Sequence, residues 1–274
     1  MGRRSITLHS PRFARKERRR KTRRLLFFSI FGAALTVGIL YFLNTPRFLL
    51  SQVAVSGADE TTRSEVKALA ERTLSGMYLG LISRAHPFFY PKTELVGQVL
   101  AAFPQFSRVD ISRDGLSALR LGVTLRTPAA LWCSGEACAY LDANGIAFAD
   151  APTGSEQLYY RLSKENDSAG ATLIGTEVLA PERLAALFAF FQQLENKGLV
   201  PLQANFTATG SVVVSLRSGA RLFIQESEGY DTALKQLEVL LRESGLIPRQ
   251  GTTQELNLDY IDLRYGNKVY FKPR

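Results

Sequence analysis

The pattern of hydrophobic and polar positions divides the chain at one uncharged stretch of nineteen residues, 25–43 (LLFFSIFGAALTVGILYFL). At about 1.5 Å rise per residue, such a stretch makes a helix of roughly 28 Å, close to the roughly 30 Å hydrocarbon core of a bilayer. It therefore predicts one transmembrane helix. A buried helix of a soluble domain and a cleaved secretory signal are the alternatives, but no small-x-small processing site follows the run.

A strongly basic tail, residues 1–24, precedes this stretch and holds eleven Lys or Arg against one acid, Glu17. Basic residues beside a first span stay in the cytoplasm, so residues 47–274 are expected outside the inner membrane. The tail is expected to be disordered, with a helical stretch running into the span, and to contact anionic lipid. DNA binding is the alternative. Without the tail, however, the net charge of +9 falls to −1, so no nucleic-acid partner is expected for the rest.

Residues 48–127 predict a first domain in the order strand, helix, helix, strand, strand. Alternating apolar and polar residues predict strands at 50–56, 106–113 and 119–126. Apolar positions three and four apart predict two helices, one that starts at a capping box at 62–65 and one at 92–102. Two helices on one face of a three-stranded sheet are expected. Between them, residues 77–91 form a long aromatic-rich connection, which is expected to fold back onto its own core; a partner-binding loop is the alternative.

From Pro128 onward the pattern becomes rich in short strands. It predicts a hairpin at 130–141, strands near 146–149 and 159–162, and an antiparallel meander at 202–226. Helices are predicted from Pro181 to Gly198 and at 230–244. The chain is therefore α+β, and its second domain, residues 128–274, is a mainly antiparallel β-domain with at least two flanking helices.

The C-terminal segment changes its buried face part-way along. Leu256, Leu258 and Tyr260 share one face, whereas Ile261, Leu263 and Tyr265 share the other. Because side chains alternate strictly along a strand, this slip predicts a bulge near Tyr260. Gly266 and Asn267 then fit a two-residue hairpin turn before a last strand at 268–272.

The two cysteines, Cys133 and Cys138, lie five residues apart around a predicted turn. In an oxidising compartment this spacing suits a disulfide across a hairpin, with two free thiols as the alternative. No metal site is expected, because the only histidines, His9 and His86, are predicted on opposite sides of the membrane. His86 is expected to be a surface or turn residue. No cofactor is expected.

Small residues recur four apart within the predicted span. Gly32 and Thr36 form one pair, and Ala34 and Gly38 form the other. Such spacing allows a partner helix to pack closely, although small residues also occur in spans that have no partner.

Three segments in this order resemble the FtsQ/DivIB family of bacterial cell-division proteins: residues 125–132 (LRTPAALW), 140–148 (YLDANGIAF) and 260–265 (YIDLRY). The resemblance covers the chain from about residue 20 to its end. It implies a POTRA domain next to the membrane and a larger β-domain beyond it. It also implies a non-enzymatic role at the division septum, in which these domains bind single-span partners of the FtsB and FtsL type.

In that family the last strands offer an edge to which the FtsB-like partner adds a strand. Here this edge corresponds to Arg264, Tyr265, Asn267, Lys268 and Tyr270, and truncation before Glu255 is expected to abolish binding. The chain departs from the family at 125–128, where Glu-Arg-x-Pro is usual, in its long connection 77–91 and in its cysteine pair. The alternative is an ordinary edge strand protected from aggregation by Lys268 and Lys272.

Two other function classes remain as rivals. An enzyme is disfavoured because the extracytoplasmic part has neither Gly-x-Ser-x-Gly nor His-Glu-x-x-His and has one histidine; no small-molecule substrate is expected. A POTRA-bearing envelope transport or assembly factor is the second rival. It would be expected to show an outer-membrane barrel or a tandem array of such domains.

Overall fold

A computed structural model describes residues 11–45, 49–165, 174–243 and 257–274, with side chains from Arg20 onward in these ranges. The predictions about His9, Leu256 and most of the basic tail's side chains lie outside the described residues. The chain forms two compact units. The first comprises Met1–Val99 and Val109–Val123, and the second comprises Leu100–Arg108 and Thr124–Arg274.

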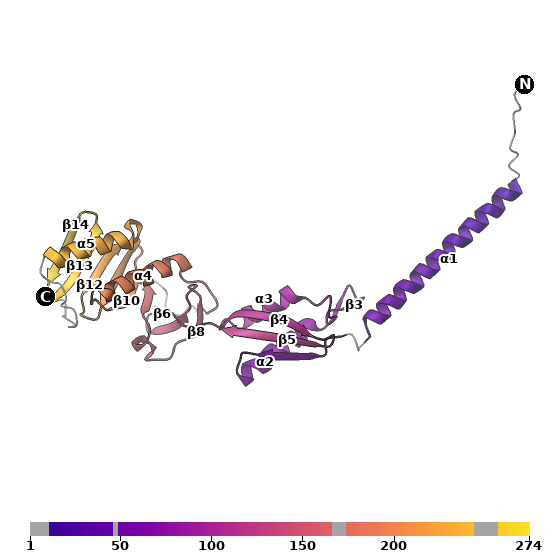
Figure 1. Ribbon diagram of the computed structural model, residues 1–274, viewed down its shortest axis with the longest axis horizontal. Helices are drawn as coiled ribbons and strands as arrows, with labels where there is room; N and C mark the ends of the chain where they lie inside the picture. The colour runs from indigo at the N-terminus through magenta and orange to yellow at the C-terminus, as the bar shows by residue number, and fades with distance from the viewer. Residues whose placement is uncertain (1–10, 46–48, 166–173, 244–256) are drawn as a thin grey trace, which may run out of the picture. The chain divides into compact units, whose positions relative to one another are not determined.

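The N-terminal part is one long helix, α1 (Pro11–Leu43; Figure 1). Its portion Arg20–Leu43 is long and apolar enough to cross a membrane by length and composition. The predicted helical stretch in the basic tail is confirmed, whereas disorder was wrong for the residues from Pro11 onward. Lys and Arg are good helix formers and proline is favoured in a first turn, so the apolar helix can extend back into the basic sequence.

The rest of the first unit has the predicted order of elements. It contains strand β1 (Gln52–Ser56), helix α2 (Glu60–Leu74), and most of helix α3 (Lys92–Ala102) and of strands β4 (Phe106–Asp114) and β5 (Ala118–Leu125). The three strands make one sheet in the order β1-β5-β4, with β1 and β5 parallel. Along β5 only Leu119, Leu121 and Val123 are buried. The helices therefore cover one face of this sheet.

Helix α2 begins earlier than the predicted capping box. Asp59 is its N-cap, and its carboxylate accepts a hydrogen bond of 3.1 Å from the backbone N–H of Thr62. These hydrogen bonds from Thr62 lower the pKa of Asp59. The prediction placed the start at the Thr62–Glu65 capping box, three positions too late, and did not consider Asp59, which is also a favoured N-cap residue.

The connection 77–91 forms a two-stranded hairpin, β2 (Met77–Tyr78) with β3 (Ile82–Ser83). The prediction that its apolar side chains return to the core was wrong for most of them. Its exposed large apolar residues are Met77, Tyr78, Leu79, Leu81, Phe88 and Phe89. His86 lies in the turn that follows but is buried, and burial lowers its pKa.

The second unit contains a mixed sheet in the order β14-β13-β12-β11-β10-β9-β6-β7-β8. The first strands along the chain are β6 (Ala130–Ser134), β7 (Ala137–Leu141), β8 (Ala147–Asp150) and β9 (Arg161–Lys164). They are followed by β10 (Pro201–Phe206), β11 (Ser211–Leu216), β12 (Arg221–Gln225), β13 (Leu258–Tyr265) and β14 (Lys268–Pro273). The predicted meander β10-β11-β12 is confirmed, since both of its pairs are antiparallel.

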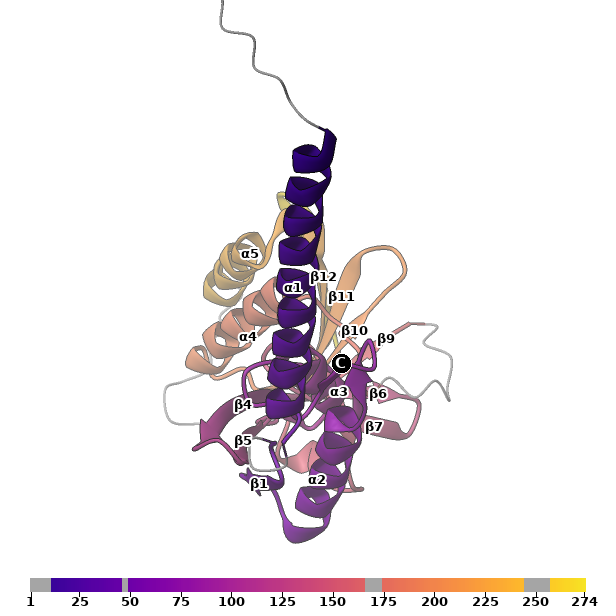
Figure 2. The same cartoon turned by 90° about the vertical axis from the view of Figure 1, so that its right-hand side faces the viewer.

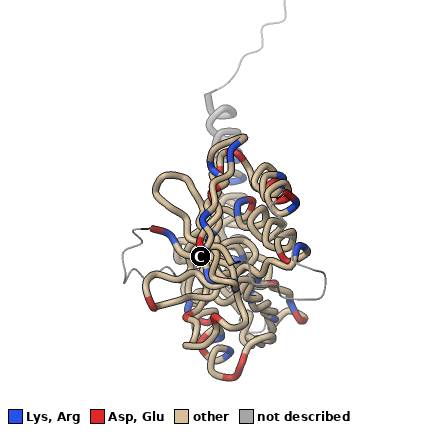
Figure 3. The backbone as a smooth tube through the Cα atoms, turned by 90° about the vertical axis from the view of Figure 1, so that its left-hand side faces the viewer, with Lys and Arg blue, Asp and Glu red and all other residues tan. Residues whose placement is uncertain are grey.

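The two helices of this unit are α4 (Pro181–Asn196), between β9 and β10, and α5 (Tyr230–Glu243), between β12 and β13. Each helix joins two neighbouring parallel strands, as in a βαβ unit. Figure 2 shows both helices on the same side of the sheet. They bury one continuous core that includes Phe190, Leu237 and Ile261. Acidic and basic residues are interspersed over this unit (Figure 3), in keeping with the near-neutral charge outside the tail.

Candidate protein-interaction edge

The C-terminal hairpin β13–β14 carries the predicted partner-binding residues. Its pairing shifts register between Leu258 and Tyr260, which confirms the bulge predicted near Tyr260, and shifts again between Asp262 and Tyr265. Tyr265 pairs with Lys268 across Gly266 and Asn267, so the predicted two-residue turn is also confirmed. The first bulge leaves Leu258 and Ile261 buried together in the core.

Strand β14 ends the sheet on one side, within the described part of the chain. The backbone N–H of Arg274 donates to the carbonyl of Asn257 at 3.2 Å, so it points toward the β13 side. Backbone groups alternate between the two sides of a strand, and β14 itself has no bulge. The N–H groups of Tyr270 and Lys272 therefore point toward β13 as well. Those of Val269 and Phe271 point toward the open edge.

At the opposite end of the sheet, the start of β8 is already paired with neighbouring chain. The N–H of Ala147 in β8 donates to the carbonyl of Thr176 at 3.1 Å, and the carbonyl of Ala147 accepts from the N–H of Gly175 at 2.7 Å. Ile146 forms a further bridge with Glu177. Of the two ends of this sheet, the one at β14 is therefore better suited to receive an added strand.

Arg264 is held in place by neighbours on the sheet. Its guanidinium forms a two-pronged ion pair with Asp262, with distances of 2.8 Å and 2.6 Å, and its backbone N–H donates to the same carboxylate. The guanidinium also lies over the rings of Phe223, at 5.2 Å, and Tyr265, at 5.7 Å. Hydrogen bonding to Asp262 raises the pKa of Arg264. This side chain is a fixed positive charge rather than a mobile one.

Two exposed tyrosines flank this arginine. The rings of Tyr265 and Tyr270 meet edge to face with centroids 5.4 Å apart. Both are exposed, as are Asn267 and Lys268 in and after the turn. The structure thus brings Arg264, Tyr265 and Tyr270 into one cluster and leaves Asn267 and Lys268 at the tip of the hairpin. Such aromatic and arginine side chains are enriched at protein interfaces.

Sequence reasoning missed Asp262, Phe223 and Asp259 as parts of this site. Asp259 pairs with Arg221 at 3.1 Å and with Lys272 at 3.4 Å, and these contacts lower its pKa, with the hydrogen bond from Arg221 as the largest cause. Lys272 shares this carboxylate with Arg221, so the three side chains together keep a net positive charge at the edge. The sequence did offer one signal for Asp259. It is next to Tyr260 in the predicted strand, and neighbouring side chains of a strand point to opposite faces.

The predicted cysteine pair is joined by a disulfide across the hairpin β6–β7, where Cys133 and Cys138 are directly opposite with Cα atoms 4.1 Å apart.

The small residues of the predicted span lie in α1. A Cβ added at Gly32 or Gly38 would meet no atom of the described chain within 4 Å. The hydroxyl of Thr36 donates to the carbonyl of Gly32 at 2.9 Å. Contact of either pair, Gly32 with Thr36 or Ala34 with Gly38, with a partner helix stays a prediction.

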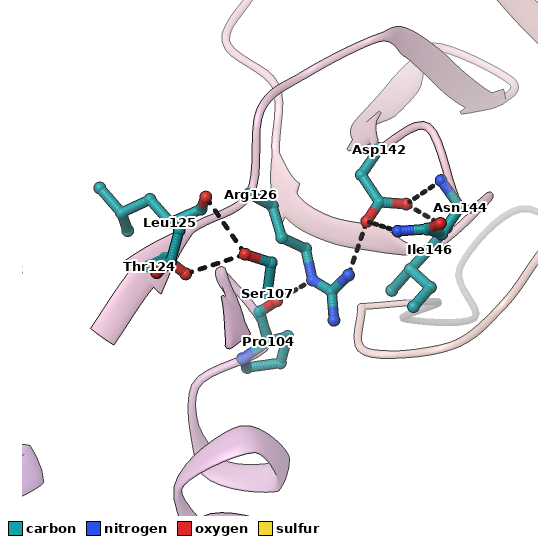
Figure 4. Close-up of polar contacts among 8 residues, drawn as sticks. All are labelled: Pro104, Ser107, Thr124, Leu125, Arg126, Asp142, Asn144 and Ile146. Carbon is teal, nitrogen blue, oxygen red and sulfur yellow. Dashed lines mark hydrogen bonds and ion pairs between the residues drawn. The ribbon is translucent and has the colours of Figure 1, made fainter. Parts of the chain in front are cut away.

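Two of the three segments that carried the resemblance, 125–132 and 140–148, meet in a buried ion pair of the second unit (Figure 4). Arg126 contacts the carboxylate of Asp142 at 2.6 Å and donates from Nε to the carbonyl of Pro104 at 2.9 Å. The same carboxylate accepts the backbone N–H groups of Asn144 and Ile146, each at 2.9 Å. The pair therefore fixes the turn after β7. A side chain at Gly145, where φ is +72°, would collide with the backbone of Leu179.

No cluster of three or more His, Cys, Asp or Glu residues that could hold a metal ion occurs among the residues that the structure describes. No protein-family model matches the chain, and a comparison with curated proteins finds no match. The resemblance to the FtsQ/DivIB family therefore rests on the sequence segments alone.

Proposed function

We propose that this protein is a non-enzymatic, membrane-anchored scaffold of the bacterial cell-division complex, of the FtsQ/DivIB type. It binds single-span partners of the FtsB and FtsL type through its extracytoplasmic units. The FtsB-like partner adds a β-strand to β14. The observation that carries this proposal is the open edge of β14 beside the cluster of Arg264, Tyr265 and Tyr270.

Strand addition is supported by both parts of the edge. The outward N–H groups of Val269 and Phe271 supply backbone hydrogen bonds that do not depend on the partner's sequence. The side chains of Tyr265, Tyr270 and Lys268 supply selectivity, since they are exposed beside those groups. The position of Pro273 is consistent with this arrangement, because alternation turns its nitrogen, which lacks a hydrogen, toward the open edge.

The membrane topology proposed here follows from α1. Its apolar portion crosses the inner membrane once, with the basic tail in the cytoplasm and residues 47–274 outside. The first unit is a POTRA domain, supported by its order of strand, two helices and two strands. A POTRA-bearing transport or assembly factor would share this first unit but would have no reason to keep β14 open for an FtsB-like strand.

Binding is tested by co-purifying the full chain, solubilised from membranes, with FtsB-type and FtsL-type partners from the same cell. Truncation before Glu255 would remove β13 as well, and with it the buried Ile261 and Leu263, so loss of binding could reflect loss of the core. Truncation before Lys268 removes β14 alone and is the sharper variant. We expect it to lose the FtsB-type partner while still inserting into the membrane, and retained binding would refute the proposed edge.

Localisation separates the two function classes. A fluorescent fusion followed through the cell cycle is expected to gather at midcell as the septum forms. A uniform envelope distribution, together with co-purification of a transport component, would favour the POTRA-bearing transport factor instead.

A further inference from the structure

The hairpin β2–β3 presents an apolar tip to solvent. Residues 77–83 (MYLGLIS) hold no charge, and Leu79 at the tip is 95% exposed. Met77 and Leu81 beside it are also exposed. Exposed apolar side chains that are contiguous, rather than scattered, mark an interaction site.

The backbone at this tip is unfavourable for the residue that occupies it. Leu79 has a φ of +49°, and no other non-glycine residue in the described ranges has a positive φ. With Gly80 at +70°, it forms a tight turn in which asparagine or glycine is normally found. A leucine here costs energy both in its backbone and in its exposure to water. A compensating environment is therefore expected around its side chain.

The hairpin is tied to the C-terminal end of α1. The side chain of Asn44, the residue after the helix, donates to the carbonyl of Leu81 at 2.7 Å and accepts from the N–H of Ser83 at 3.0 Å. Asn44 also donates to the carbonyl of Leu40, at 2.8 Å, inside the helix. One side chain thus links the last helical turn to the far strand of the hairpin.

These distances set how far the tip can lie from the membrane. If Arg24 marks the inner boundary, the roughly 28 Å apolar stretch brings Leu43 to the outer boundary of a roughly 30 Å hydrocarbon core. Leu79 is two residues from Leu81, so their Cα atoms are at most about 7 Å apart. Interfacial segments bury their apolar faces about 5–10 Å into the boundary between headgroups and acyl chains. The tip is therefore within reach of lipid.

The side chains behind the tip suit the same boundary. The guanidinium of Arg84 lies over the ring of Tyr78, 5.6 Å from its centroid, and pairs with Glu94. Tyrosine and arginine are both enriched at the level of the headgroups, where an aromatic ring and a charge are each accommodated.

We propose that the hairpin β2–β3 is a second, interfacial membrane contact, in which Met77, Leu79 and Leu81 insert into the outer leaflet beside the exit of α1. This inference rests on the membrane span of the proposed function. It assigns a lipid surface, not a protein, as the ligand of the tip. Its effect is to restrict the first unit to the membrane surface, since that unit is then held at two points.

The test places a fluorescent label at single cysteines of the full chain, reconstituted in phosphatidylcholine–phosphatidylglycerol vesicles. Cys133 and Cys138 are joined and do not react. The labelled variants are Leu79→Cys, Val37→Cys within α1, and Leu158→Cys, an exposed leucine of the second unit. Lipids carrying a nitroxide at a shallow or a deep acyl position quench the label according to its depth.

We expect shallow nitroxides to quench the label at position 79 about twofold, deep ones to quench position 37, and neither to quench position 158. Quenching at 37 but not at 79 overturns the interfacial contact and leaves the span intact. Absence of quenching at 37 refutes the span, and the inference falls with it. Shielding of position 79 only after an FtsB-type or FtsL-type partner is added would show that a protein covers the tip, and this also overturns the proposal.

The link through Asn44 has its own variant. Asn44→Ala removes both hydrogen bonds to the hairpin, and we expect shallow quenching at position 79 to fall while deep quenching at position 37 is unchanged. Unchanged quenching at both positions would refute the positioning role of Asn44.

Discussion

Replacing Phe271 by proline tests strand addition at a single backbone group. Phe271 is in the edge strand β14, and alternation from the Arg274 hydrogen bond turns its N–H away from β13. Phe271→Pro therefore removes a donor to the partner without removing a donor to the sheet. Proline is tolerated in edge strands on this side. The side chain of Phe271 is 43% exposed, so its loss leaves most of the core intact.

The expected size of the effect follows from one lost interstrand hydrogen bond. Because only one of the two bonding groups is removed, the partner's carbonyl is left unpaired, which costs about 1–3 kcal/mol. A loss near 2 kcal/mol corresponds to roughly 30-fold weaker binding. Phe271→Ala is the matched control, because it loses the same ring but keeps the N–H. The ratio of the two dissociation constants then isolates the backbone group.

The assay is fluorescence anisotropy with the labelled extracytoplasmic segment of the FtsB-type partner, titrated with the full chain in nanodiscs. Thermal unfolding of both variants shows whether β14 is still formed. If Phe271→Pro and Phe271→Ala unfold at the same temperature and bind the partner equally well, backbone pairing at this edge is refuted.

Three further predictions concern the second unit. Arg126→Met leaves Asp142, whose side chain is 6% exposed, buried without its cation, and should lower the free energy of unfolding by about 3 kcal/mol. Adding Asp142→Asn to this variant should recover part of the loss in urea titrations. An unchanged urea midpoint for Arg126→Met would contradict the role of the pair. Replacing Cys133 and Cys138 together by serine should cost about 2 kcal/mol, the loop-closure term for cysteines five residues apart, and the reduced native protein should match this variant. Burial, and then the hydrogen bond to Glu195, raise the pKa of Tyr160 to about 12, so its stabilising contribution is complete below the unfolded value near 10 and is lost as the pH rises through 12. Urea unfolding of Tyr160→Phe should lack this loss between pH 10 and 12, and an identical pH dependence in both proteins would count against it.

Local periodicity predicted most of the elements because they are amphipathic. Helix α3 begins and ends where its apolar spacing and the following Pro104 indicate, and the bulge at Tyr260 follows from one slip in alternation. The order of the strands was not predictable in this way. Strand β9 pairs with both β6 and β10, and its partners lie far away in the sequence on either side. Such pairing depends on which faces meet in the folded chain.

Buried polar contacts were the least predictable part. Arg126 and Asp142 are sixteen residues apart and belong to residue types that are usually exposed, so nothing local marks them as a buried pair. The tip at Leu79 misled the prediction for the opposite reason. Apolar side chains normally return to the core, and the sequence alone does not reveal that a short hairpin directs these outward.

The same limit applies to the predicted interface itself. The family resemblance assigned one role, contact with the partner, to five residues: Arg264, Tyr265, Asn267, Lys268 and Tyr270. In the structure, Arg264 has already used its guanidinium on Asp262 and on the face of Phe223, whereas Tyr265, Tyr270 and Lys268 remain exposed. Removing Arg264 would leave Asp262 buried without its cation and would loosen β13 before any partner is present. A loss of binding in that variant would therefore reflect a change in the structure of the edge and not the loss of a direct contact with the partner. Only the exposed side chains, and the N–H groups of Val269 and Phe271, report on contact with the partner.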